Sequence, residues 1–144
     1  MAMQVRRVVT GRDLSGHDAI LVDEISQNGR ILAPGHESCV LWSTPSTVAK
    51  SSGNNFPAAT GPSLAGNTVL RIMELKPGVA PLIRRTKSCD YVIVLSGELV
   101  VKVGDKETTL KVGDVCIQKG TEQNWINRGS EPCRLAVIRI DAER

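Results

Sequence analysis

The chain has 144 residues, of which 41% are apolar and 3% aromatic, and its net charge is +3. This length favours one domain over residues 1–144, with a core built from Val, Ile, Leu and Ala. Acidic and basic residues are interleaved without a basic run, so we expect no nucleic-acid partner. No apolar run approaches a membrane span or a signal peptide, which predicts a soluble, cytoplasmic protein.

Short strands dominate the first part of the chain. We expect strands over residues 4–9, 19–24 and 37–43, separated by turn signals such as Asn28-Gly29 and Pro34-Gly35. Residues 44–67 are rich in Ser, Pro, Gly and Thr. A loop of that length is uncommon in a compact domain, and three interpretations are open: a lid over the barrel mouth, a segment that contacts a partner subunit, or disorder.

The second part of the chain has a more regular strand rhythm. The predicted strands span residues 68–75, 91–95, 98–103, 107–110, 115–118, 123–127 and 133–140. Between them stand turns such as Ser96-Gly97, Gly104-Asp105 and Lys119-Gly120. Between a turn at Pro77-Gly78 and the strand at 91–95, the chain reads as an extended approach. No segment has the pattern of a three-turn helix, so the sequence predicts an all-β barrel or sandwich.

Four cysteines are spread along the chain: Cys39, Cys89, Cys116 and Cys133. Their spacing contains no Cys-x-x-Cys and no zinc pattern with histidine. We predict free thiols rather than disulfides, because a chain with its own core does not need cross-links. Cys116 has no histidine near it in sequence, so we interpret it as an inert core residue rather than a nucleophile.

Two motifs resemble those of the cupin family. The first family motif, Gly-x5-His-x-His-x3-Glu-x6-Gly, keeps every spacing here at Gly78, Arg84, Thr86, Asp90 and Gly97. The second, Gly-x5-Pro-x-Gly-x2-His-x3-Asn, corresponds to Gly113, Gln118, Gly120, Gln123 and Asn127, with its first spacer one residue short. The resemblance covers roughly residues 67–140. It implies a single cupin-like antiparallel β-barrel (jelly roll) and a homodimer.

The family's metal ligands are replaced in this sequence. The ligand positions hold Arg84, Thr86, Asp90 and Gln123, of which only Asp90 is a good ligand for a divalent metal. Arg84 also brings a permanent positive charge to the place where the cation would sit. We therefore predict a site with no metal and no cofactor. A metal site with unusual ligands remains an alternative, although His17 and His36 lie outside both motifs and read as loop residues.

A catalytic pocket follows from the same positions. Alternation along a strand puts Arg84 and Thr86 on one face, and Gln123 and Trp125 on one face. By resemblance, these faces and Asp90 look into the barrel. Arg84 would grip an oxyanion in fork geometry, and Asp90 would act as general acid or base. Thr86 and Gln123 would orient the substrate against a wall formed by Trp125.

Other residues extend or limit that pocket. Arg71 and Met73 share one face of the strand at 68–75; if that face is interior, Arg71 is a second handle for an anion, and otherwise it is a solvated rim residue. Tyr91 follows Asp90 directly and therefore points away from it. The alternative without a function for the pair Arg84 and Asp90 is a salt bridge that merely fills the place of a lost metal site.

The leading hypothesis is a cofactor-independent lyase or isomerase that acts in biosynthesis of secondary metabolites. It would catalyse dehydration, isomerisation or cyclisation of an oxygenated, polyketide-like small molecule by proton transfer, with Asp90 and Arg84 as catalytic residues. The resemblance to small cupins found beside biosynthetic enzymes motivates this choice. The alternatives are a non-catalytic cupin that binds an anionic small molecule and a metal-dependent cupin with unusual ligands.

Overall fold

The computed structural model describes residues 3–26, 29–44, 68–85 and 87–141, and these residues form strands and turns without any helix. The strands are, in chain order, β1 (Arg6–Arg12), β2 (Asp18–Ile25), β3 (Gly29–Ala33), β4 (His36–Thr44), β5 (Thr68–Leu75), β6 (Leu82–Arg85), β7 (Cys89–Ser96), β8 (Leu99–Val103), β9 (Lys106–Leu110), β10 (Val115–Lys119), β11 (Glu122–Ile126) and β12 (Cys133–Ile140). Without a helix, the described chain offers no helical span that could cross a membrane.

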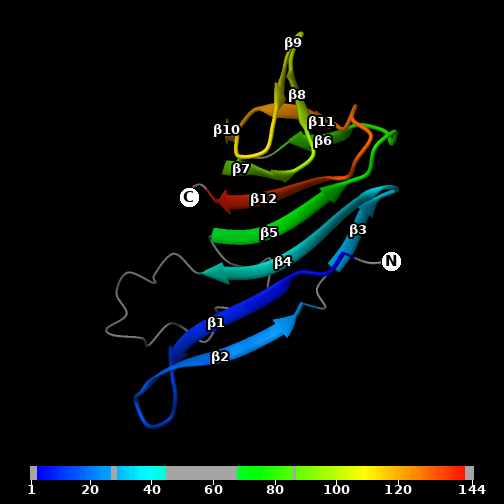
Figure 1. Ribbon diagram of the computed structural model, residues 1–144. Helices are drawn as coiled ribbons and strands as arrows, with labels where there is room; N and C mark the ends of the chain where they lie inside the picture. The colour runs from blue at the N-terminus through cyan, green and yellow to red at the C-terminus, as the bar shows by residue number, and fades with distance from the viewer. Residues whose placement is uncertain (1–2, 27–28, 45–67, 86, 142–144) are drawn as a thin grey trace.

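Two antiparallel sheets enclose the interior of the barrel. One has six strands in the order β10-β7-β12-β5-β4-β3, and the other has four in the order β6-β11-β8-β9. Figure 1 shows the strands from β7 to β4 lying one below the other, with the strands of the four-stranded sheet above them. The all-β antiparallel fold predicted from the sequence is confirmed.

The barrel interior is filled where the two sheets face each other. Inward side chains of β5, β7 and β12, including Met73, Val92 and Leu135, pack against Leu99 and Trp125 from the four-stranded sheet, and all are fully buried. Period-two alternation selects these residues, because every second side chain of each strand points inward. The opposite end of this interior holds the polar residues described below.

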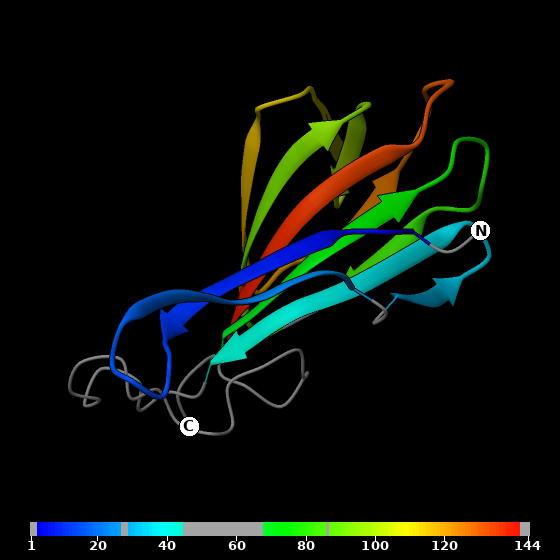
Figure 2. The same ribbon diagram turned by 60° about the horizontal axis from the view of Figure 1, so that its bottom comes forward.

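The N-terminal segment covers part of the outer face of the six-stranded sheet. Met3 packs with Cys39 and Ile72 in a second, smaller core cluster, and its backbone N–H donates to Glu37 at 2.7 Å. The hairpin of β1 and β2 continues from this segment and lies across the sheet, as Figure 2 shows. Because of this cover, both faces of β5 are buried over part of its length, and its burial does not alternate simply.

The turn at Gly97 shows why the first motif ends in glycine. Gly97 has a φ of 73°, which is in the left-handed region that side chains disfavour. A Cβ atom at this position would lie 2.6 Å from the carbonyl oxygen of Pro132. The turn between β7 and β8 therefore needs a glycine both for its backbone angle and for the close approach of the chain before β12.

Most strand predictions hold, with three differences. Strand β3 was not predicted, because turn signals on both sides hide its five residues. The extended approach before the strand at 91–95 contains a strand, β6, and β7 begins at Cys89 instead of Tyr91. The prediction that His36 is a loop residue is wrong: it begins β4, is 2% exposed, and its Nε2 lies 2.7 Å from the carbonyl oxygen of Ala80.

Some of the other predictions concern described residues, and some concern residues outside them. His17 lies outside the strands, between β1 and β2, and all four cysteines are free thiols, as predicted. Tyr91 is 37% exposed on the outer face of β7 while Asp90 is fully buried, which confirms that they point apart. Thr44 ends β4, and the rest of the predicted loop at 44–67 lies outside the described residues. Thr86 also lies outside them.

Candidate functional site

Strand pairing brings the predicted site residues to one region of the interior. Arg84 on β6 lies directly opposite Gln123 on β11, and Asp90 on β7 lies opposite Gln118 on β10. On the other side of β7, Asp90 is opposite Arg139 of β12. Directly opposite residues of an antiparallel pair project to the same face, so these side chains share the interior.

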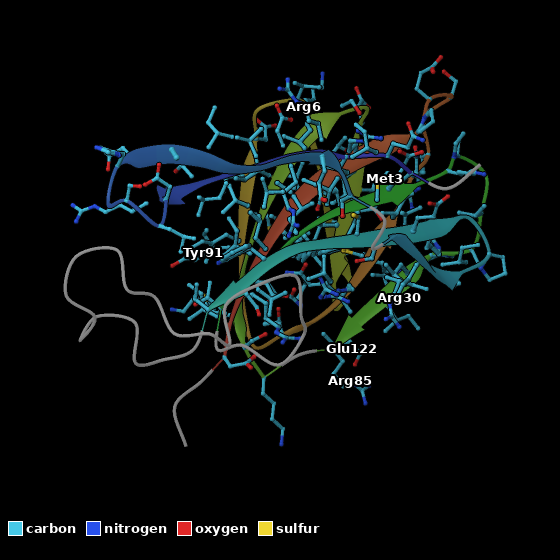
Figure 3. The ribbon with its side chains drawn as sticks, turned by 90° about the horizontal axis from the view of Figure 1, so that it is seen from below. Met3, Arg6, Arg30, Arg85, Tyr91 and Glu122 are labelled. Atoms are coloured by element: carbon cyan, nitrogen blue, oxygen red, sulfur yellow. The ribbon has the colours of Figure 1, made fainter. Side chains whose placement is uncertain are left out.

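A surface ion pair links β6 and β11 next to the site. Arg85 Nη2 lies 2.7 Å from Glu122 Oε2, and Figure 3 shows the two side chains beside each other at one end of the molecule. These residues alternate with Arg84 and Gln123, which point to the other face. The ladder between β6 and β11 thus places this pair outside and Arg84 and Gln123 together inside.

Asp90 is the acidic centre of the site. Its carboxylate is fully buried, and Oδ1 accepts a hydrogen bond of 2.6 Å from the hydroxyl of Ser88. Oδ2 lies 3.6 Å from Nη2 of Arg84, which is an ion pair but too long for a hydrogen bond. Within the described part of the chain, Oδ2 has no hydrogen-bond partner. One carboxylate oxygen is thus held in place and the other is unused.

Arg84 lies between Asp90 and an aromatic ring. Its guanidinium carbon is 5.2 Å from the ring centre of Trp125, and its side chain is 13% exposed. Burial lowers the pKa of Arg84, with the charge of Asp90 acting in the opposite direction and the charge of Arg139 adding to the fall. Its Nε and Nη2 make no hydrogen bond to any described residue. These two donors can bind an oxygen of a ligand.

Two glutamines and Trp125 complete the polar lining. The Trp125 indole N–H donates to Gln123 Oε1 at 2.9 Å, so Gln123 orients the ring that faces Arg84. Gln118, at the family's proline position, is fully buried; its amide nitrogen donates to the Thr121 carbonyl at 2.7 Å, and its Oε1 has no hydrogen-bond partner among the described residues. Trp125 is also part of the core cluster, which makes it a packed wall.

The inner face of β5 carries Arg71 and Met73. Met73 is fully buried in the core, and Arg71 is 7% exposed, so the alternative of a solvated rim arginine is wrong. Burial lowers the pKa of Arg71 to about 10, and repulsion from Arg84 and Arg139 contributes, with Asp90 acting in the opposite direction. Among the described residues, Arg71 makes no side-chain hydrogen bond or ion pair, and its buried Nε has no partner there.

Sequence reasoning missed three residues of this region. Ser88, Gln118 and Arg139 contribute a hydroxyl, an amide and a charge near Asp90. Gln118 was noted only as a departure from the motif. Arg139 could have been suggested by alternation, because it shares a face with the buried Leu135 and Val137 of β12. No local signal marks Ser88.

The donor chemistry of this region does not fit a metal ion. No group of three His, Cys, Asp or Glu side chains converges anywhere in the described residues. At the family's ligand positions, Arg84 is a cation and Gln123 already accepts from Trp125 through its oxygen, which leaves Asp90 as a single strong ligand. The positive charge of Arg84 opposes a second cation beside it.

The fold and the site together define a class: a small β-barrel whose interior carries polar side chains at the positions of two glycine-framed motifs. A family model described as "Cupin domain" matches residues 71–139. A cupin-domain-containing oxidoreductase of Aspergillus ruber, fogC, is 30% identical over 149 residues, which cover 96% of this chain and 73% of that protein. The chain belongs to the cupin family.

Further relatives come from fungal biosynthesis clusters. Phomopsin biosynthesis cluster protein C' of Diaporthe leptostromiformis is 46% identical over 85 residues, which are 58% of this chain and 45% of that protein. The chain thus matches less than half the length of that relative. Oryzines biosynthesis cluster protein J of Aspergillus oryzae is 34% identical over 82 residues, covering 56% of this chain and 46% of that protein.

Solved structures agree on the fold. The cupin domain of Schizosaccharomyces pombe Cnp3 superposes on this chain with a TM-score of 0.60 at 13% identity. The superposed region covers 95% of this chain and 88% of the Cnp3 chain. A putative ethanolamine utilization protein of Salmonella typhimurium superposes with a TM-score of 0.57 at 16% identity, covering 98% and 99%. Identities this low establish the barrel and nothing about the reaction.

Proposed function

We propose that this cupin is a biosynthetic enzyme that moves a proton on an oxygenated small molecule, in a dehydration, isomerisation or cyclisation, without a metal. The observation that carries the proposal is the pair of Asp90 and Arg84. A fully buried carboxylate keeps one oxygen without a hydrogen bond, and the neighbouring guanidinium keeps two nitrogens without one, counting partners in the described chain. An acid–base group and an oxyanion binder therefore stand side by side.

Such a pair suits proton abstraction next to a carbonyl group. Asp90 Oδ2 would take the proton from carbon, the electron pair of that C–H bond would move to the carbonyl oxygen, and Arg84 would stabilise the resulting enolate by charge and hydrogen bonding. Returning the proton to another carbon gives an isomer. Returning it to a leaving β-hydroxyl group releases water and gives a dehydrated product.

Neighbouring residues would hold the reacting groups in place. The Ser88 hydroxyl fixes the carboxylate through Oδ1 and leaves Oδ2 for the substrate. Trp125 holds the guanidinium by a cation–π contact, and Gln123 holds Trp125. Thr86, Gln123, Arg71 and Met73 remain predicted substrate-binding residues. Because the unused atoms of Asp90 and Arg84 are closed to bulk water, the interior has to open for a substrate to reach them.

The relatives support the biosynthetic context but favour a second reaction type. By their names, some relatives belong to phomopsin and oryzines biosynthesis clusters, while three others are called oxidoreductases. A redox reaction on a similar small molecule is therefore the second candidate. The product mass separates the two: isomerisation leaves it unchanged, dehydration removes water, and oxidation removes hydrogen or adds oxygen. The cytoplasm stays the predicted location.

Deuterium exchange tests the proposal before the natural substrate is known. A panel of β-hydroxy ketones and keto acids is incubated with the enzyme in D2O, and nuclear magnetic resonance follows exchange at the carbon beside the carbonyl. We expect catalysed exchange that falls by at least about a hundredfold in Asp90→Asn. Glu122→Gln, which removes a surface carboxylate instead, should exchange like wild type. Equal exchange in Asp90→Asn and wild type would refute Asp90 as the base.

A homodimer stays a prediction, and the outer face of β7 and β10 is where we propose the contact. Tyr91 and Ile117 lie directly opposite each other there, are 37% and 51% exposed, and adjoin the 54% exposed Val115. A second copy of the chain would cover these apolar side chains. Light scattering should give a dimer mass for wild type and a monomer mass for Ile117→Asp; a monomeric wild type contradicts the contact.

A further inference from the structure

The interior of the barrel contains more positive than negative side chains. The charge of Arg139 lowers the pKa of both Arg71 and Arg84, the charge of Arg84 lowers that of Arg71 as well, and Asp90 is the acid that raises both. Arg84 is paired with Asp90, and Nε of Arg139 lies 3.1 Å from Asp141. Arg71 is left as the guanidinium for which the described residues provide no paired acid.

The neighbours of Arg71 offer it no counter-charge. Directly opposite it stand Val40 on β4 and Val137 on β12, both buried. On its own strand, the nearest residues of the same face are Val69 and Met73, both fully buried. A buried guanidinium surrounded in this way carries a desolvation cost, which the charge of Asp90 offsets only in part and the charges of Arg84 and Arg139 increase.

The outer face of the same two strands shows the contrast. Arg134 on β12 lies directly opposite Glu74 on β5, and Nη2 of Arg134 is 3.1 Å from Oε2 of Glu74. The half-exposed Arg134 thus has an acid directly opposite it in the sheet, whereas the buried Arg71 has valines directly opposite it. An unpaired charge is retained in a protein interior where a ligand supplies its partner.

Register places Arg71 away from the proposed reacting end. Asp90 lies level with Arg139 and Val69, and Arg71 is two residues further along β5. Two strand spacings and two residues separate the Cα atoms of Asp90 and Arg71 by about 12 Å. The side-chain ends lie within electrostatic range of each other, so a ligand that meets both needs an anionic group that is separate from its reacting carbon.

We propose that Arg71 binds a carboxylate that the substrate carries in addition to its reacting group. The substrate class is then an oxygenated carboxylic acid rather than a neutral ketone or alcohol. This inference rests on the proposed function for the reacting end, but the anion site itself depends on Arg71 alone. The fork of Arg71 would bind both carboxylate oxygens, and Arg139 and Arg84 would add attraction at longer range.

Binding of a simple carboxylate tests the site without turnover. Benzoate and its neutral analogue benzamide are titrated into the full-length protein in a buffer free of chloride and phosphate, by calorimetry and by the shift in melting temperature. We expect benzoate to bind and benzamide not to bind. Arg71→Gln should weaken benzoate binding by at least about tenfold, because it removes a charge-assisted pair. The matched variant Arg134→Gln should bind benzoate like wild type.

Other outcomes overturn the proposal. It fails if wild type ignores benzoate, if Arg71→Gln binds it normally, or if chloride at the same ionic strength gives the same shift, since the site would then take small inorganic anions. Should Arg71→Gln fold poorly, Arg71→Lys keeps the charge but loses the fork, and an intermediate affinity is expected. Asp90→Asn should retain benzoate binding; if it also loses deuterium exchange, both proposals stand, and each can fail without the other.

Discussion

Replacing Arg71 by methionine should stabilise the ligand-free protein. The pKa of Arg71 is lowered to about 10 in the folded chain, mainly through burial. At 1.36 kcal/mol per pKa unit, this fall corresponds to about 3 kcal/mol by which folding disfavours the charged form. Methionine fills similar volume between Val40 and Val137 without a charge. We expect the free energy of unfolding to rise by about 1–3 kcal/mol.

The sign of the pH dependence follows from the same values. Because the pKa of Arg71 is lower in the folded chain than in the unfolded chain, the unfolded chain binds more protons from about pH 10 up to the ordinary pKa of arginine. The contribution of Arg71 to the free energy of unfolding therefore rises with pH across that window. Below pH 10, the full cost of the buried charge is present, so the gain in Arg71→Met is complete at neutral pH.

Urea denaturation at neutral pH, followed by tryptophan fluorescence, measures the effect. Arg71→Met should have a higher midpoint with an unchanged slope, and its melting temperature should rise by roughly 3–9 °C. Arg134→Met is the matched control: it breaks a half-exposed pair with Glu74 and should not stabilise. If Arg71→Met is less stable than wild type, Arg71 has a partner inside the protein, and the reasoning for a ligand carboxylate is refuted.

Three further predictions concern packing and reactivity. Gly97→Ala should cost about 2–4 kcal/mol of stability, because of its positive φ and the clash with Pro132, whereas Gly104→Ala, with open space around it, should cost about 1 kcal/mol; equal losses in thermal melts contradict the clash. Burial raises the pKa of Cys133 to about 11, so iodoacetamide at pH 8 should leave this thiol unlabelled in the native protein and label it after denaturation; rapid native labelling, seen by peptide mass spectrometry, would show that it is accessible. Asn127→Ala should destabilise the protein by about 2 kcal/mol in urea, because its side-chain amide donates to two backbone carbonyls at 2.9 and 2.8 Å; a change below about 0.5 kcal/mol would mean that water replaces both bonds.

Arg84 stands at a position where the family has a metal ligand, and this replacement changes what the whole site can do. A metal in the family's position would supply a positive charge that attracts and polarises an oxygen atom. The guanidinium of Arg84 supplies a positive charge at a ligand position, with unused donors and a neighbouring carboxylate. It offers hydrogen bonds in fixed directions instead of open coordination positions. Chemistry by proton transfer next to a bound oxyanion suits this arrangement.

Local sequence determined the strands and the frame of the site. Alternation of apolar residues and glycine turns located most strands, and the spacing from Gly78 to Gly97 identified the positions of Arg84 and Asp90. These features are readable because a strand's alternation and a turn's positive φ depend on residues close together in the chain. Strand β3 was not predicted, because five residues between two turns are too few to show an alternating pattern.

Only the tertiary structure decided which polar residues face the interior. The sequence left Arg71 open between a rim and an interior position, and it assigned His36 to a loop, although both are buried. Alternation divides a strand into two faces, but it does not say which face is covered, and here the N-terminal segment covers part of the outer face as well. The pairing of β7, β12 and β5 brings the charges of Asp90, Arg139 and Arg71 together from positions far apart in sequence, which no local pattern encodes.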